Sequence, residues 1–78
     1  MNNLERYTKI FMETFEISKE EATGAKFHEI ARWDSIGQMS LIAALEEEFD
    51  IYFEPEDIIL VTSFEDGKEV LKKYDVEF

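Results

Sequence analysis

Hydrophobic residues recur along most of this chain at the three- and four-residue spacing of amphipathic helices. The first such segment runs from about Asn3 to Phe15, with Asn2 or Asn3 in position to cap it. The second begins at Ser35 and continues to about Phe49, and it is the strongest helical signal in the sequence. Four of its residues form a stripe expected to face the core: Leu41, Ile42, Leu45 and Phe49.

Two more helices are expected toward the C-terminus. A short one begins at Pro55, a residue favoured at the first helical position, and runs to about Leu60. The last begins after Thr62 or Ser63, and Thr62 with Glu65 has the spacing of a capping box. The predicted fold is therefore all-α, a small bundle of three main helices plus one short helix, in a single domain spanning 1–78.

The long segment between the first two helices, from Glu16 to Asp34, has no sustained periodicity. Ser18 and Glu21 match the spacing of a capping box, which predicts a short helical turn within the segment. A loop of this length in a small domain is either functional or held by its own apolar side chains. The residues expected to hold it are Ile17, Phe27, Ile30 and Trp33.

Charge narrows the range of partners. Nineteen acidic residues against eight basic ones give a net charge of -11, while 45% hydrophobic residues are enough for a folded core. Phosphate backbones and anionic membranes are repelled by such a surface, so we expect no nucleic-acid binding and no membrane insertion. The longest apolar run, Leu41 to Leu45, is also too short to span a bilayer. Partners with basic docking patches are favoured.

The remaining composition argues against chemistry by the chain alone. There is no cysteine, His28 is the only histidine, and no glycine-rich phosphate cradle is present. We therefore expect neither an enzyme nor a metal site. The N-terminal "MNNLERYTKI" lacks the apolar core of a signal peptide, and a chain without cysteine suits a reducing compartment, so a cytoplasmic location is expected.

The pair Asp34–Ser35 stands directly before the most hydrophobic run. Either residue could simply be the N-cap of the second helix, an interaction worth roughly 1 kcal/mol. A hydroxyl at a helix N-terminus is also a favourable point of attachment for a phosphate group. A second apolar stripe, which the core need not cover, lies beside it: Ile36, Met39 and Ala43.

The segment "DSIGQMSLIAALEEEFDI" at 34–51 resembles the Asp-Ser-Leu segment of acyl carrier proteins and the helix that follows it. The similarity continues more weakly over nearly the whole chain, including "VTSFEDGKEVLKKY" in the last helix. It implies that a phosphopantetheinyl transferase, using Mg²⁺, transfers 4'-phosphopantetheine from coenzyme A to Ser35. The thiol of that arm then holds acyl groups as thioesters, so the sulfur belongs to the cofactor.

The resemblance also implies roles for the neighbours of the serine. It assigns Asp34 to the transferase interface, and it implies that acyl-transferring or acyl-activating enzymes dock on a monomeric carrier. The apolar stripe would contact these partners or line the way to an acyl cleft, and two acidic side chains would meet basic residues on them. The residues so assigned are Ile36, Met39, Ala43, Glu46 and Glu47.

The segment departs from the pattern of fatty-acid carriers. Gly37 stands where an acidic residue is usual, Gln38 and Ser40 leave the first half of the helix uncharged, and Ile36 replaces leucine. Glycine costs a helix about 1 kcal/mol relative to alanine, so a mobile helix start is expected. These departures favour a dedicated pathway over bulk fatty-acid synthesis. Two alternatives stay open: a peptidyl or aminoacyl carrier, and a small acidic helical adaptor that binds a basic partner without covalent modification.

Overall fold

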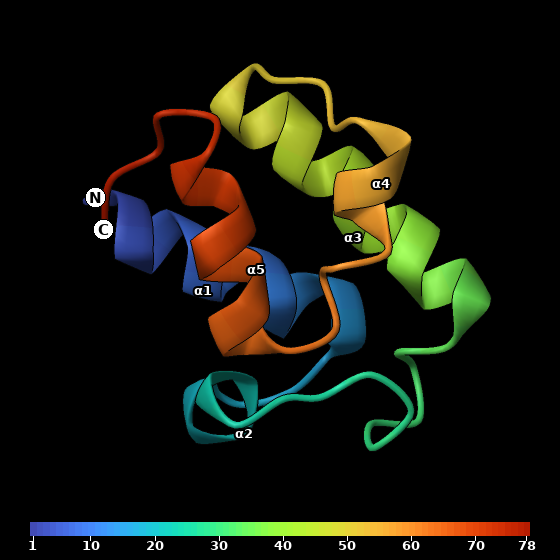
Figure 1. Cartoon of the computed structure of the whole chain (residues 1–78). Helices are drawn as coiled ribbons and strands as arrows, with labels where there is room; N and C mark the ends of the chain where they lie inside the picture. The colour runs from blue at the N-terminus through green and yellow to red at the C-terminus, as the bar shows by residue number, and fades with distance from the viewer.

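Five helices and no β-strand make up the chain in the computed structural model, which describes residues 1–78. They are α1 (Asn3–Phe15), α2 (Lys19–Thr23), α3 (Ser35–Phe49), α4 (Pro55–Ile58) and α5 (Phe64–Lys72). The two chain ends lie together beside α1 and α5, and the N-terminal end of α3 lies on the opposite side of the molecule (Figure 1). The all-α bundle predicted from the sequence is confirmed, and α2 is the helical turn expected after Ser18.

Side-chain caps account for where the helices begin. Asn2 and Glu5 form a capping box on α1, and Ser18 and Glu21 form another on α2. Both pairs satisfy backbone N–H groups that a helix start leaves without partners. The short helix α4 begins at Pro55 as predicted but ends earlier, at residue 58.

The capping box predicted for Thr62 and Glu65 is wrong. The N-cap of α5 is Ser63, whose Oγ accepts a hydrogen bond of 2.9 Å from the backbone N–H of Asp66. The reason is tertiary, because the carbonyl of Thr62 is occupied by the N–H of Phe27, at 2.9 Å, from the long loop. The hydroxyl of Thr62 donates instead to the carboxylate of Asp66.

An aromatic cluster forms the centre of the core. The Phe11 ring centroid lies 5.1 Å from that of Phe64 and 5.4 Å from that of Trp33, and Phe15 stacks on Trp33 at 5.1 Å. Trp33 is fully buried, so it holds the long loop against α1 as predicted. None of the helices combines the length and the apolar composition needed to cross a membrane.

Contact between α1 and α5 depends on a tyrosine and a glycine. The Tyr7 hydroxyl donates a hydrogen bond of 2.7 Å to the carbonyl of Phe64, and burial raises the pKa of this hydroxyl. A Cβ atom on Gly67 would lie only 2.1 Å from the Tyr7 hydroxyl oxygen. A larger residue at position 67 would therefore have to displace the Tyr7 hydroxyl from its hydrogen bond to Phe64.

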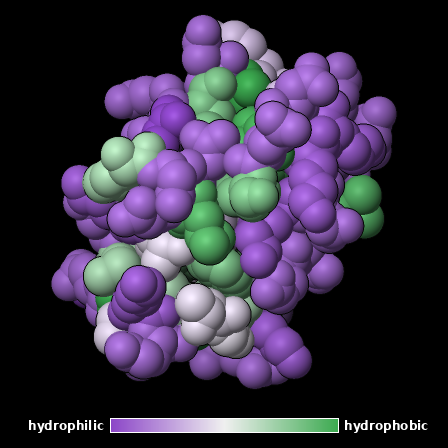
Figure 2. Space-filling view, turned by 90° about the vertical axis from the view of Figure 1, so that its left-hand side faces the viewer, coloured by the Kyte–Doolittle hydropathy of each residue, from purple (hydrophilic) through white to green (hydrophobic).

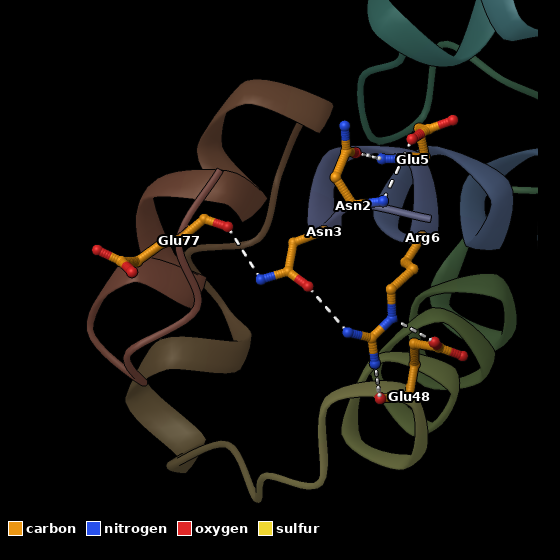
Figure 3. Close-up of polar contacts among 6 residues, drawn as sticks. All are labelled: Asn2, Asn3, Glu5, Arg6, Glu48 and Glu77. Atoms are coloured by element: carbon orange, nitrogen blue, oxygen red, sulfur yellow. Dashed lines mark hydrogen bonds and ion pairs between the residues drawn. The ribbon is translucent and has the colours of Figure 1, made fainter.

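Arg6 joins three parts of the chain that are distant in sequence (Figure 3). Its Nε lies 2.7 Å from a carboxylate oxygen of Glu48, and its terminal nitrogens donate to the carbonyl of Glu48 and the side chain of Asn3. Asn3 in turn donates to the carbonyl of Glu77 at 3.0 Å. The guanidinium also lies 4.8 Å from the ring centroid of Phe49, which is half-buried at the end of the predicted core stripe.

A buried carboxylate fixes α4 to the segment after α5. Asp57 is 4% exposed and accepts hydrogen bonds from Lys73 Nζ at 2.6 Å and from the Tyr74 hydroxyl at 2.7 Å. The Tyr74 hydroxyl also accepts from the backbone N–H of Glu54. The hydrogen bonds from Lys73 and Tyr74 lower the pKa of Asp57, and the same ion pair raises the pKa of Lys73.

Replacing the Asp57 carboxylate should change how the free energy of unfolding depends on pH in the acidic range. The pKa of Asp57 is lower in the folded chain than in the unfolded chain, so its contribution is full above the unfolded value of about 3.9 and is lost as the pH falls through the folded value. We expect Asp57→Asn to be less stable than the wild type at pH 7, with the difference narrowing below about pH 4. Urea unfolding at a series of pH values measures this difference.

Glu13→Gln is the control, because Glu13 is an exposed carboxylate on α1 that makes no ion pair or side-chain hydrogen bond within the chain. The difference in free energy of unfolding between this control and the wild type should not narrow in the way expected for Asp57→Asn. A stability difference for Asp57→Asn that stayed constant from pH 7 to pH 3 would contradict the assigned role of the Asp57 carboxylate.

Candidate functional site

The structure distinguishes the two residues of the Asp-Ser pair. Asp34 has extended backbone geometry, and its carboxylate accepts a hydrogen bond of 2.9 Å from the N–H of Gly37, so Asp34 is the N-cap of α3. Ser35 is the first residue of the helix and is exposed. Its hydroxyl makes no hydrogen bond within the chain. Asp34 alone is therefore the N-cap, and the hydroxyl of Ser35 takes no part in capping the helix.

The backbone around Ser35 suits a covalently attached anion. The N–H groups of Ser35 and Ile36 have no acceptor within the chain, whereas those of Gly37 and Gln38 are bound by Asp34. Free N–H groups at the start of a fifteen-residue helix, together with the helix dipole, favour negative charge at this point. A phosphodiester on the Ser35 oxygen fits this environment.

Gln38 connects the segments around the serine. Its side-chain oxygen accepts a hydrogen bond of 2.6 Å from the indole N–H of Trp33, and its amide donates to the carbonyls of Ile58 and Val61 at 3.1 and 3.0 Å. One amide thus joins the long loop, α3 and the end of α4. The sequence interpretation treated Gln38 only as an uncharged position, and no sequence pattern indicates its hydrogen bonds to Ile58 and Val61.

The apolar stripe expected beside the serine is exposed. Ile36 is 79% exposed and Met39 is 60% exposed, and Ala43 is exposed farther along α3. The structure adds Ile59, which is 73% exposed and which sequence reasoning did not assign to the site. Ile59 lines a shallow pocket of about 220 Å³ together with Phe27, Gln38, Ile58, Val61 and Thr62.

The two acidic residues assigned to partner binding differ in their surroundings. Glu46 accepts a hydrogen bond of 2.9 Å from the backbone N–H of Phe53, so part of its carboxylate stabilises the turn after α3. Glu47 is exposed and has no partner within the chain. Both line a surface depression of about 380 Å³ with Ala43, Asp50 and Tyr52. Partner binding by either residue stays a prediction.

Other reactive groups do not gather near Ser35. Arg32 lies 3.1 Å from Glu16, and both side chains are well exposed. Nowhere do three histidine, cysteine, aspartate or glutamate side chains come close enough together to hold a metal ion. No family model matches the chain. The arrangement is thus a free hydroxyl at a helix start, with apolar and acidic surface alongside.

Gly37 has a steric role that its helix propensity does not reveal. A Cβ atom at this position would lie 1.9 Å from the carbonyl oxygen of Arg32 and 3.3 Å from a ring carbon of Phe15. The first turn of α3 therefore packs against the end of the long loop, and only glycine permits this approach. The departure from the carrier pattern at Gly37 has a local structural cause.

Two glycine substitutions test this steric role. Helix propensity alone predicts that Gly37→Ala stabilises the chain by about 1 kcal/mol. We expect instead that it lowers the free energy of unfolding by about 1–3 kcal/mol, because a clash with backbone must be relieved. Gly24→Ala is the control, since no atom lies within 4 Å of its added Cβ and its φ is -106°.

Urea unfolding of both variants provides the comparison. Gly24→Ala should leave stability unchanged or raise it by about 0.4–1 kcal/mol, through the lower entropy of the unfolded chain. A Gly37→Ala variant as stable as the wild type would mean that the long loop does not hold Arg32 against α3.

Proposed function

We propose that this chain is an acyl carrier protein whose Ser35 carries a 4'-phosphopantetheine arm. The observation that carries the proposal is the separation of roles at the start of α3: Asp34 caps the helix, and the exposed hydroxyl of Ser35 is unused by the fold. The resemblance of residues 34–51 to the carrier segment supports the same assignment. When bound, the arm supplies the thiol that this cysteine-free chain lacks.

The residues of the chain have passive roles in this proposal. The free N–H groups of Ser35 and Ile36 lower the electrostatic cost of a phosphodiester on the serine. Asp34 keeps the helix start in place while the hydroxyl reacts, and its exposed side chain next to Ser35 is proposed to contact the transferase that brings coenzyme A and Mg²⁺. The hydrogen bond from Trp33 to Gln38 holds the end of the preceding loop against α3.

Partner enzymes are proposed to dock on the outer surface of α3. Ile36 and Met39 supply exposed apolar area next to the serine, and Ala43 lies farther along. Glu47, with the free part of Glu46, supplies negative charge for a basic docking patch. The uncharged first half of α3 supports a dedicated pathway, in lipid or other acyl chemistry, rather than bulk fatty-acid synthesis.

Covalent loading is the direct test. After incubation with coenzyme A, Mg²⁺ and a broad-specificity phosphopantetheinyl transferase, intact-protein mass spectrometry should detect one added phosphopantetheine on the wild type and none on Ser35→Ala. Ser40→Ala, which removes another exposed hydroxyl of α3, should be loaded like the wild type. Because Asp34 caps the helix, Ser35→Ala should change the free energy of unfolding by less than about 0.5 kcal/mol.

Failure of several transferases to load the wild type would contradict the carrier proposal. The acidic adaptor, which uses the same α3 surface without modification, would then account better for the exposed Ile36 and Met39. A Ser35→Ala variant that unfolded would show that the serine is needed for the fold.

Charge at Glu47 should affect the encounter with the transferase. We expect Glu47→Gln to lower kcat/KM for loading about two- to fivefold at low salt, in line with the value of one exposed charge contact. Glu13→Gln is the matched control, because Glu13 is an exposed, unpaired carboxylate on α1. Both variants change the net charge equally, and the difference between them should shrink at higher ionic strength. Equal effects of the two variants would indicate that only net charge matters.

A further inference from the structure

A second candidate binding surface lies on the face that carries the chain ends. Hydrophobic residues gather in the middle of this face between hydrophilic ones (Figure 2). There α1, α2 and α5 enclose a groove of about 380 Å³ with Leu4, Met12 and Phe64 among its apolar lining. Its volume is within the range of small-ligand sites. The start of α3 is on the opposite side of the molecule (Figure 1).

The groove is lined by more basic than acidic residues, whereas the molecule as a whole is strongly acidic. Three of the eight basic residues line it: Lys9, Lys19 and Lys68. Five of the eight are ion-paired within the chain, but Lys9 and Lys19 have no acidic partner within 4.0 Å. In a chain of nineteen acids, two unpaired lysines at one groove provide a local attraction for an anion.

The carboxylates of the groove are already engaged. Glu65 lies 2.8 Å from the ammonium of Lys68. Glu5 accepts the backbone N–H of Asn2 in the capping box of α1. Neither carboxylate forms an ion pair with Lys9 or Lys19, so the positive charge of these two lysines remains available to a ligand.

The shape and lining of the groove favour a narrow apolar ligand. Leu4, Thr8 and Met12 follow one another along the same side of α1, a distance of about 12 Å for eight residues of helix. Leu4 is 41% exposed, and methionine side chains such as Met12 adapt to ligands of different shape.

We propose that this groove binds a single-chain amphiphile with an anionic head, namely a medium-chain alkyl carboxylate. Its alkyl tail lies along Met1, Leu4 and Met12, and its carboxylate is attracted to Lys9 and Lys19. Binding is non-covalent and independent of any modification of Ser35. It thus goes beyond the carrier function and does not depend on it.

The test uses the unmodified ¹⁵N-labelled chain, titrated with decanoate and, separately, with 1-decanol. Decanoate should shift the amide signals of the groove residues, and the uncharged alcohol should bind more weakly. The double variant Lys9→Gln with Lys19→Gln should weaken decanoate binding about five- to tenfold, since two exposed charge contacts are lost. The double variant Lys26→Gln with Lys72→Gln makes the same change in net charge outside the groove, and it should bind like the wild type.

Three results would overturn the proposal. The first is that decanoate does not shift the amide signals of the groove residues. This includes the case in which it shifts only those of Ile36 and Met39. The second is equal binding of decanoate and decanol, or equal weakening by the two double variants, because the groove lysines would then have no specific role. The third is a concentration-dependent shift of the groove signals without ligand, which would identify a second copy of the chain as the occupant.

Discussion

The arrangement around Ser35 depends on one half-buried amide. Gln38 accepts a hydrogen bond from the indole N–H of the buried Trp33. It donates to the carbonyl of Ile58, the last residue of α4, and to that of Val61, in the segment after α4, so three segments meet at a single side chain. The indole N–H of Trp33 and the carbonyl of Val61 have no other partner within the chain, and a buried polar group without a partner costs about 1–3 kcal/mol. The amide therefore fixes the loop before Ser35 and α4 relative to the first turn of α3. Gln38 makes these contacts on the side of α3 that faces the rest of the chain. Ser35 is exposed, and its side chain makes no contact on which the fold depends.

The division between framework and free surface continues along α3. Asp34 and Gly37 serve the fold, the first by capping and the second by allowing the carbonyl of Arg32 to approach. Ser35 and Ile36, between them in sequence, make no side-chain hydrogen bond and are exposed. A helix whose first turn is held by Asp34 and Gly37 can present the two residues between them to a partner without losing stability. Substitutions of the exposed set and of the framework set should thus have separable effects on binding and on folding.

Periodicity was sufficient to predict most of the fold, because apolar spacing along α1 and α3 dominates the burial of this small core. It predicted the bounds of both helices, and the capping pair Ser18–Glu21 identified α2. Periodicity and capping motifs did not predict the features that long-range contacts determine. Thr62 has the right spacing for a capping box, but its carbonyl pairs with Phe27, a residue thirty-five positions earlier. Gly37 and Gln38 were read as local departures from a motif, since nothing in their neighbours reveals the approach of Arg32 or of α4.

The acidic residues of this chain differ in how far the fold uses them. Glu48 binds Arg6, Asp57 is buried between Lys73 and Tyr74, and Glu46 holds the backbone of Phe53. Such carboxylates stabilise tertiary contacts, and their charge is partly neutralised by donors. Glu47 has no such donor, so its charge faces solvent. Net charge therefore overstates the negative surface available for docking, and the position of each carboxylate relative to its donors determines which ones a basic partner can reach.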